Sequence, residues 1–182
     1  MTAIHFYEKT KPFYEFSNFY TNPKECIIID DELWINTEQY FQANKFYIPD
    51  SPQHMEYYNV IKSTDSPMKA VCLGRQKLSG RFAGNWVVNR ATDKRTLGEA
   101  IEQYKHLSIR PDWEQVKIRD MLHGLMCKFS QSESLGKLLL QTGDADIVEA
   151  SPRDAFWGWG KDQQGENMLG KLLVDVRVKM ST

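Results

Sequence analysis

The segment that organises the chain runs from Asp154 to Asp162 and reads DAFWGWGKD. It alternates two glycines with two tryptophans, which makes it too poor in helix formers for a helix and too rich in large rings for a solvated loop. Glycine lets a backbone approach a ligand closely, and an indole offers a flat face to a base or sugar. We therefore expect residues 157–160 to form a wall of a binding site. The alternative is a glycine-kinked core strand with two buried tryptophans.

Length and charge narrow the classes of protein. A chain of 182 residues fits one domain that is large enough to enclose a pocket. Its 23 Lys and Arg residues balance 24 acids, for a formal net charge of −1. This balance argues against tight, sequence-independent binding of nucleic acid, so any such contact should be local.

The cysteines and histidines are scattered. Cys26, Cys72 and Cys127 lie far apart in apolar surroundings, which favours reduced core residues over a disulfide framework. The histidines show no metal-ligand spacing, so we expect neither a metal nor another cofactor. The chain shows no signal segment and no apolar run of about 20 residues, and we expect a soluble, cytoplasmic protein without membrane contact.

Hydrophobic spacing and turn residues predict a mainly helical α+β domain with a few short strands. Alternation in residues 15–20 is typical of an edge strand, although Asn18 between two phenylalanines could also present its amide to a ligand. Residues 79–92 lack periodicity and are expected to form a loop over the pocket. The expected strands are residues 3–7, a hairpin of 26–29 and 33–35, and residues 147–149. The first expected helix begins after Asn36, and the next ones span 54–62, 67–77 and Thr92 or Asp93 to 106. A long helix should begin at 110, another should lie around 135–142, and the last should begin at 166.

The helix after Asn36 has the best-marked beginning. Asn36 is a suitable N-cap, and Ile35 and Tyr40 are spaced as a hydrophobic staple. Helical spacing puts an acid, an amine, an amide and a phenyl ring on one face. A solvated charged face is the usual explanation of such a pattern, but a phenyl ring in its middle argues for a functional face. These four residues are Glu38, Lys45, Gln42 and Phe41.

Together the segments resemble the NADAR or YbiA-like superfamily of N-glycosidases, in order along nearly the whole chain. The stretch from about 77 to 109 is longer than in the shortest members, and we treat it as a family-variable insertion in a single domain, 1–182. The matching residues are Phe16–Phe19, Trp34, Thr37–Ala43, Lys45–Phe46, Ser66–Met68, Gly74–Arg75, Lys128–Phe129, Leu139, Thr142–Gly143, Val148–Glu149, Asp154, Trp157–Gly158, Gly160, Gly165, Asn167, Leu169–Gly170, Leu172–Leu173 and Arg177.

The resemblance implies hydrolysis of an N-glycosidic bond on a ribose 5′-phosphate or ADP-ribose unit. Some relatives act on early riboflavin-pathway intermediates, ribosylaminopyrimidine phosphates. Others remove ADP-ribose from the amino group of guanine in DNA or RNA and thereby counter DarT-type ADP-ribosyltransferases. We expect the guanine-linked substrate, with the riboflavin intermediate as the alternative. A non-catalytic reader of ADP-ribose or nucleotides would need the aromatic wall but not the acids and the amine.

Cleavage of a carbon–nitrogen bond sets the expected roles. Nitrogen leaves readily only when protonated, so Glu38 or Asp154 should supply a proton or activate water. The resemblance further implies that Lys45 forms a Schiff base with ring-opened ribose; the competing role is electrostatic. Arg75 could hold a phosphate with its forked donors. The candidate catalytic residues are Glu38, Lys45 and Asp154, and the candidate substrate-binding residues are Phe16, Asn18, Phe19, Phe41, Gln42, Arg75, Trp157, Gly158, Trp159, Gly160 and Asn167.

Overall fold

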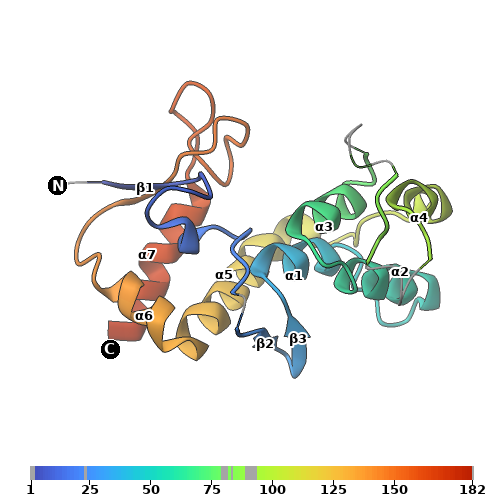
Figure 1. The fold of residues 1–182 in the computed structure, drawn as a ribbon, viewed down its shortest axis with the longest axis horizontal. Coiled ribbons are helices and arrows are strands. Elements are labelled where there is room, and N and C mark those ends of the chain that lie inside the picture. Colours follow the sequence, from blue (N-terminus) through green and yellow to red (C-terminus); the bar gives the residue numbers. More distant parts are fainter. Residues whose placement is uncertain (1–2, 23, 79–81, 83, 89–93, 182) are drawn as a thin grey trace. The chain divides into compact units, whose positions relative to one another are not determined.

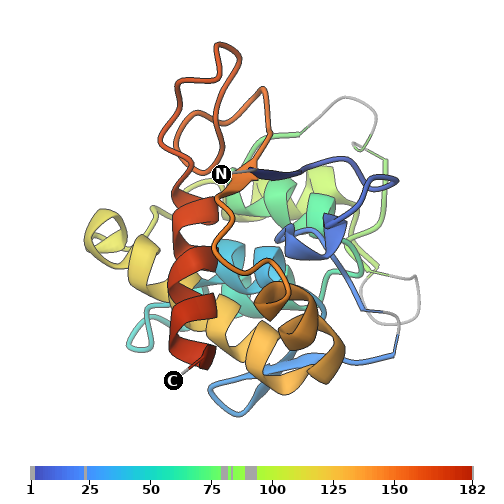
Figure 2. The same ribbon diagram turned by 90° about the vertical axis from the view of Figure 1, so that its left-hand side faces the viewer.

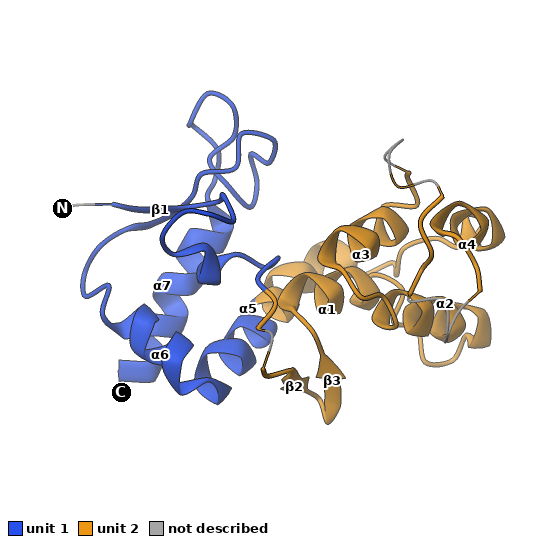
Figure 3. Ribbon diagram, viewed as in Figure 1, with its two compact units in different colours: residues 1–20, 122–182 blue, residues 21–121 orange. Residues whose placement is uncertain are grey.

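The computed structural model describes residues 3–22, 24–78, 82, 84–88 and 94–181, which form a mainly helical α+β structure, as predicted (Figure 1). The chain divides into two compact units: unit 1 comprises residues 1–20 and 122–182, and unit 2 comprises residues 21–121 (Figure 3). Unit 1 contains β1 (Ile4–Phe6), the 3₁₀ helix η1 (Tyr14–Phe16), α6 (Glu133–Leu140), β4 (Ile147–Glu149) and α7 (Met168–Ser181). Unit 2 contains β2 (Ile27–Ile29), β3 (Glu32–Trp34), α1 (Thr37–Asn44), α2 (Pro52–Lys62), α3 (Pro67–Gly74) and α4 (Leu97–Tyr104), and α5 (Trp113–Gln131) begins in unit 2 and ends in unit 1.

Unit 1 is assembled around a parallel pair of strands from distant parts of the chain. β1 pairs with β4, so that Ile4 lies opposite Ile147. α7 lies beside both β4 and α6 (Figure 2). The approach of α7 to β4 depends on Gly170, because a β-carbon there would lie 2.0 Å from the carbonyl oxygen of Ile147. The loop that carries the tryptophans therefore connects a strand and a helix that are packed directly on each other.

Unit 2 begins with the predicted hairpin. β2 and β3 are antiparallel, with Ile29 opposite Glu32. The two connecting residues, Asp30 and Asp31, have φ angles of 52° and 62°. Positive φ at both positions is the geometry of a type I′ turn, whose twist matches that of the flanking strands. α1 follows the hairpin and packs against α2 and α3.

Two helices of unit 2, α1 and α4, begin where a side chain satisfies one of their first amide groups. Oδ1 of Asn36 accepts from the backbone N–H of Gln39 at 2.8 Å and caps α1, as predicted. α4 has a complete capping box between Thr96 and Glu99, so this helix starts later than Thr92 or Asp93, which lie outside the described residues. α3 ends at Gly74 rather than at residue 77.

Two further expectations are corrected. Residues 15–20 do not form an edge strand: the chain makes the 3₁₀ turn η1, which follows Phe13 with its φ of 63°. Cys26 is exposed, whereas Cys72 is buried and Cys127 is half-buried, so Cys26 is not a core residue.

Much of the predicted loop over residues 79–92 lies outside the described residues. None of the helices in the described part of the chain is long and apolar enough to cross a membrane.

Candidate functional site

The candidate residues fall into two sets, one in each unit. The set in unit 2 lies on and around α1, and the set in unit 1 lies on η1 and the tryptophan loop. Unit 2 holds Glu38, Phe41, Gln42, Lys45 and Arg75; unit 1 holds Phe16, Asn18, Phe19, Asp154, Trp157, Gly158, Trp159, Gly160 and Asn167.

The face of α1 that carries Glu38 is not a solvated surface. Every residue of α1 is buried, and Glu38 itself is 8% exposed. Phe41 packs on Trp113 with the two ring centroids 4.9 Å apart. The helix is held from its other side by Gln39, whose Nε2 donates to the carbonyl oxygen of Thr64 at 2.7 Å. The phenyl ring that set this face apart in the sequence is therefore part of a packed wall.

Glu38 is fixed in place by its neighbour one turn further along the helix. Nε2 of Gln42 donates to Oε1 of Glu38 at 2.6 Å. The Gln42 amide also lies against Gly74, where a β-carbon would lie 2.1 Å from Oε1 of Gln42. This amide oxygen is buried and has no hydrogen-bond partner among the described residues. The Gln42 side chain therefore occupies the space that a side chain at position 74 would fill, and from there it orients the carboxylate of Glu38.

Lys45 has the electrostatic surroundings of a reactive amine. Burial lowers the pKa of Lys45 to about 8, the negative charge of Glu38 opposes this shift, and Arg75 reinforces it. Nζ lies 5.6 Å from the centroid of the Phe41 ring. An amine with this pKa is partly neutral near neutral pH, which is the state that can attack a carbonyl or an iminium carbon.

Arg75 completes the set in unit 2. It caps the C-terminus of α3, directly after Gly74, and it is exposed. Its charge acts on Lys45, so the two cations are near neighbours. An exposed guanidinium near a half-buried amine and a carboxylate is suited to hold an anionic group of a ligand.

The tryptophan loop of unit 1 is neither a strand nor a solvated turn. Trp157 and Trp159 are both half-buried, so the alternative of a strand with two buried indoles is wrong. Gly158 is enclosed, since a β-carbon there would lie 2.7 Å from the carbonyl oxygen of Glu149. Gly160 has a φ of 69°, which favours glycine. The ring of His5 packs edge-on against Trp159 at 4.8 Å.

Two polar candidates of unit 1 have structural hydrogen bonds. Oδ1 of Asp154 accepts from the backbone N–H groups of Phe156 at 3.0 Å and Trp157 at 2.8 Å. The amide of Asn167 accepts from the backbone N–H of Glu149 and donates to the carbonyl of Ile147. Asp154 therefore shapes the tryptophan loop, and Asn167 fastens β4 to the start of α7. Roles of either residue in substrate binding or proton transfer stay predictions.

The aromatic segment at the start of unit 1 is held in place by Lys128, for which the sequence motifs suggested no role. Phe16 is fully buried and packs against Phe129, so it belongs to the core. Asn18 is also buried, and Phe19 is half-buried. Nζ of Lys128 donates to the carbonyl of Ser17 at 2.8 Å, and burial lowers the pKa of Lys128 to about 7. The signal available in the sequence was a lysine within the apolar spacing of the long helix.

The described residues contain no group of three or more His, Cys, Asp or Glu side chains that could hold a metal ion. The groups capable of polar chemistry around α1 are a carboxylate, an amine of lowered pKa and a guanidinium. Such a set can transfer protons, attack an electrophilic carbon and hold an anion.

The chain is similar to known proteins over nearly its whole length. A model of the NADAR domain matches residues 5–181. The N-glycosidase YbiA of Shigella flexneri is 33% identical over 180 residues, which are 99% of this chain and 89% of that protein. An N-glycosidase of Nostoc punctiforme is 32% identical over 175 residues, 96% of this chain and 90% of that protein.

Two further similarities bear on activity and fold. The chloroplastic riboflavin biosynthesis protein PYRR of Zea mays is 34% identical over 178 residues, which are 96% of this chain but only 24% of that protein. The NMR structure of the Escherichia coli protein YbiA matches 99% of this chain and 85% of its own, with a TM-score of 0.72 and 32% identity. This structural match agrees with the predicted fold.

Proposed function

Because the chain belongs to the NADAR domain family, we propose that it is an N-glycosidase that cleaves the bond between C1 of a phosphorylated ribose and a base nitrogen. Its similarity to proteins named N-glycosidases supports hydrolysis of an N-glycosyl bond. The observation that carries the proposal is the pairing of the buried Glu38 on α1 with the half-buried Lys45 directly after this helix, where the pKa of the amine is lowered to about 8. This pair offers both a proton-transfer group and a nucleophile to one sugar.

The proposed reaction proceeds through a Schiff base. Glu38 transfers a proton during opening of the ribose ring, which leaves C1 as an iminium carbon bonded to the base nitrogen. The neutral amine of Lys45 adds to C1, and the C1–base bond breaks as the base nitrogen leaves with a proton. A second iminium now joins Lys45 to C1. Water adds to this carbon, and expulsion of the Lys45 amine releases the free sugar.

The local geometry favours Glu38 over Asp154 for the proton transfers. Glu38 influences the charge state of Lys45 directly, and Gln42 holds its carboxylate. Oδ1 of Asp154 is already engaged by two backbone amides. In the proposal Arg75 binds the phosphate of the substrate, and its positive charge also keeps part of the Lys45 amine neutral.

We further propose that the leaving group is the amino nitrogen of guanine and that the sugar is ADP-ribose, so that ADP-ribosylated DNA or RNA is the substrate. The indole faces of the half-buried tryptophan loop are suited to bases or sugars. A protein that removes this modification would be the functional counterpart of a DarT-type ADP-ribosyltransferase. The similarity to the riboflavin biosynthesis protein of Zea mays favours a second candidate, a ribosylaminopyrimidine phosphate.

A side-by-side assay tests the proposal. The purified protein is incubated with a guanine-ADP-ribosylated oligonucleotide and, separately, with ribosylaminopyrimidine phosphate, and the products are identified by mass spectrometry. We expect release of free ADP-ribose from the oligonucleotide, with turnover that persists in EDTA. Release of ribose 5′-phosphate from the pyrimidine alone would select the second candidate. Glu38→Gln is the matched control for any cleavage observed, because it should be folded but inactive. Failure of the folded wild type to cleave either substrate would contradict the N-glycosidase proposal.

A further inference from the structure

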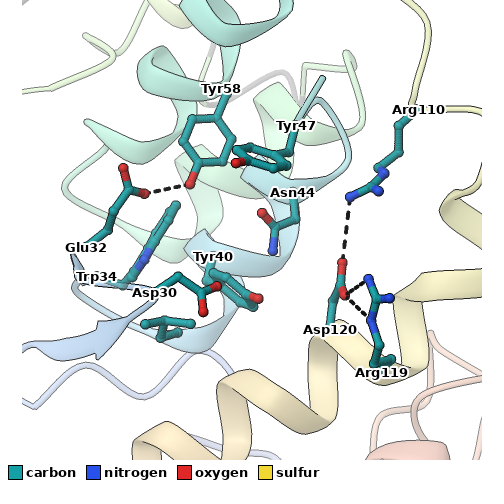
Figure 4. A pocket seen from close by; sticks show the side chains of 11 residues that line it. Asp30, Glu32, Trp34, Tyr40, Asn44, Tyr47, Tyr58, Arg110, Arg119 and Asp120 are labelled. Carbon is teal, nitrogen blue, oxygen red and sulfur yellow. Dashed lines mark hydrogen bonds and ion pairs between the residues drawn. The ribbon is translucent and has the colours of Figure 1, made fainter. Parts of the chain in front are cut away.

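Unit 2 contains a cavity of about 380 Å³ that involves none of the proposed catalytic residues (Figure 4). It is bounded by the β2–β3 hairpin, by α1 and α2, and by Arg110 and the first half of α5. α1 contributes Tyr40 and Asn44, which helical spacing places opposite Glu38 and Lys45. The lining residues are Ile29, Asp30, Glu32, Trp34, Tyr40, Asn44, Tyr47, Tyr58, Arg110, Arg119 and Asp120.

Asn44 is the residue that indicates a ligand. It is 7% exposed, and its carboxamide points from α1 into the cavity (Figure 4). No hydrogen bond to this carboxamide occurs within the described part of the chain. Among the described residues, the fully buried side-chain atoms without a partner are Nε1 of Trp34 and Oε1 of Gln42, so the Asn44 amide is not sealed off: its two donors and its acceptor oxygen can be reached from the cavity. A bound molecule with donors and acceptors of its own could pair with this amide and with the unpartnered indole N–H of Trp34, which also lines the cavity.

The walls around Asn44 are aromatic. Trp34 is 1% exposed and meets the rings of Tyr40 and Tyr58 edge-on, at centroid distances of 5.3 and 5.8 Å. Tyr47 packs on Tyr58 at 5.4 Å. Figure 4 shows the aromatic side chains and Asn44 together, with Asp120 across from them. Rings that line a cavity together with an amide favour a flat ligand whose edge carries hydrogen-bonding groups.

The acids of the lining do not make this an obvious cation site. Glu32 lies 3.0 Å from Nζ of Lys62 and accepts a hydrogen bond from Tyr58 at 2.7 Å. Asp120 accepts from Arg119 at 2.9 Å and faces Arg110 at 4.0 Å. Two of the three lining acids, Glu32 and Asp120, thus have positive partners, and the third is Asp30. With most of the acidic charge already paired, the cavity suits a neutral ligand better than an ammonium ion.

We propose that this cavity is a second ligand site, which binds a single nucleobase or nucleoside through the Asn44 carboxamide. An asparagine amide pairs with two adjacent groups of a base edge, one donor and one acceptor, and the tyrosine and tryptophan rings flank the base. A volume of about 380 Å³ is near the lower end for small-molecule sites, which range from roughly 300 to 1,000 Å³. The cavity is thus suited to one nucleoside rather than to a dinucleotide.

Nuclear magnetic resonance tests the site directly. The full chain, labelled with nitrogen-15, is titrated with adenosine, guanosine, cytidine and uridine up to roughly 10 mM, and the indole N–H signal of Trp34 is followed. We expect a saturable shift with at least one nucleoside, and we expect the shift to persist in Lys45→Arg, since that residue does not line the cavity. The same titration with tetramethylammonium tests whether the cavity binds an organic cation instead of a nucleoside.

Matched variants separate binding from folding. Asn44→Leu removes the amide at similar volume, and we expect nucleoside affinity to fall about ten-fold or more while the melting temperature is kept or raised. Asn59→Leu, the same substitution at an exposed position of α2, should bind as the wild type does. The proposal is overturned if no nucleoside shifts the Trp34 signal, if only tetramethylammonium does, or if Asn44→Leu binds as tightly as the wild type. Each of these outcomes leaves the N-glycosidase proposal intact, since that rests on Glu38 and Lys45.

Discussion

Gly74 of α3 and Gln42 of α1 are packed so closely that a β-carbon at position 74 would lie 2.1 Å from the Gln42 amide oxygen. Since the same amide holds Glu38 by a 2.6 Å hydrogen bond, Gly74→Ala should displace the carboxylate. We expect turnover to fall on the order of 10- to 100-fold, because small displacements of a catalytic group have effects of that size. Kinetic assays and a melting curve measure the two effects separately.

The control for this substitution is Gly84→Ala, since a β-carbon at Gly84 meets nothing within 4 Å. The double variant Gly74→Ala, Gln42→Ala removes the contacts with Oε1 and Cδ but keeps the β-carbon of residue 42 at 2.8 Å, so it should recover part of the thermal stability without recovering turnover. Wild-type turnover in folded Gly74→Ala would show that Gln42 does not position Glu38.

The pH dependence of the rate should report the Lys45 amine. With a pKa of about 8, the neutral, nucleophilic form increases as the pH rises through 8, so turnover should rise over the same range. Arg75→Gln removes a positive charge that lowers this pKa, so the rising limb should move to higher pH. Arg119→Gln, a substitution of an exposed arginine that does not affect Lys45, is the control. A pH profile that is identical in Arg75→Gln and wild type would refute the assignment of the limb to Lys45.

Lys128 should make folding stability depend on pH. Burial lowers the pKa of Lys128 to about 7 in the folded protein, against 10.5 for an unperturbed lysine. Between these values the unfolded chain binds a proton that the folded chain does not, so the free energy of unfolding rises with pH. Lys128→Met should reduce that rise, whereas Lys105→Met, at an exposed site, should leave it unchanged. Urea titrations at pH 7 and pH 9.5 measure the change in the free energy of unfolding between the two pH values. An equal change in Lys128→Met and wild type would contradict the prediction.

The tryptophan loop should contribute more to binding than to stability. Trp157 is half-buried and meets the ring of Phe156 edge-on at 5.0 Å. Trp157→Ala should cost about 1–3 kcal/mol of substrate binding, the usual value of a stacked base. Emptying a fully buried indole site would instead cost about 3–5 kcal/mol of folding stability. Calorimetric melting and equilibrium binding of the substrate distinguish the cases. Trp159→Ala is the parallel variant, and normal binding by folded protein in both would exclude a stacking role.

Local signals in the sequence were sufficient for the elements that depend on neighbouring residues. The cap at Asn36 and the hairpin around Asp30 and Asp31 were predictable because their hydrogen bonds and turn angles involve residues a few positions apart. Glu38 and Lys45 are near enough for the charge of the acid to act on the amine, as helical spacing indicated, while their catalytic roles stay predictions. The pairing of β1 with β4 was not predictable, since Ile4 and Ile147 are brought together only by the tertiary fold.

The features that the sequence did not predict correctly depend on contacts between distant residues or on unusual backbone angles. Residues 15–20 alternate like a strand, but Phe13 adopts a positive φ and the chain turns into η1. The structural hydrogen bonds of Asp154 and Asn167 depend on how the loop between β4 and α7 folds back, which residue types do not reveal. The cavity at Asn44 was missed because its walls come from segments as distant as Ile29 and Asp120.

Trapping of the Schiff base with borohydride tests the central claim most directly. Sodium borohydride is added during turnover of the ribosyl substrate, and the digested protein is examined by mass spectrometry. We expect a sugar-derived mass on Lys45, reduced to a stable amine, and no such mass in Lys45→Arg, which keeps the charge but does not form an imine. An unmodified Lys45 in the wild type, together with substantial turnover by Lys45→Arg, would contradict the Schiff-base mechanism and favour direct attack by water assisted by Glu38.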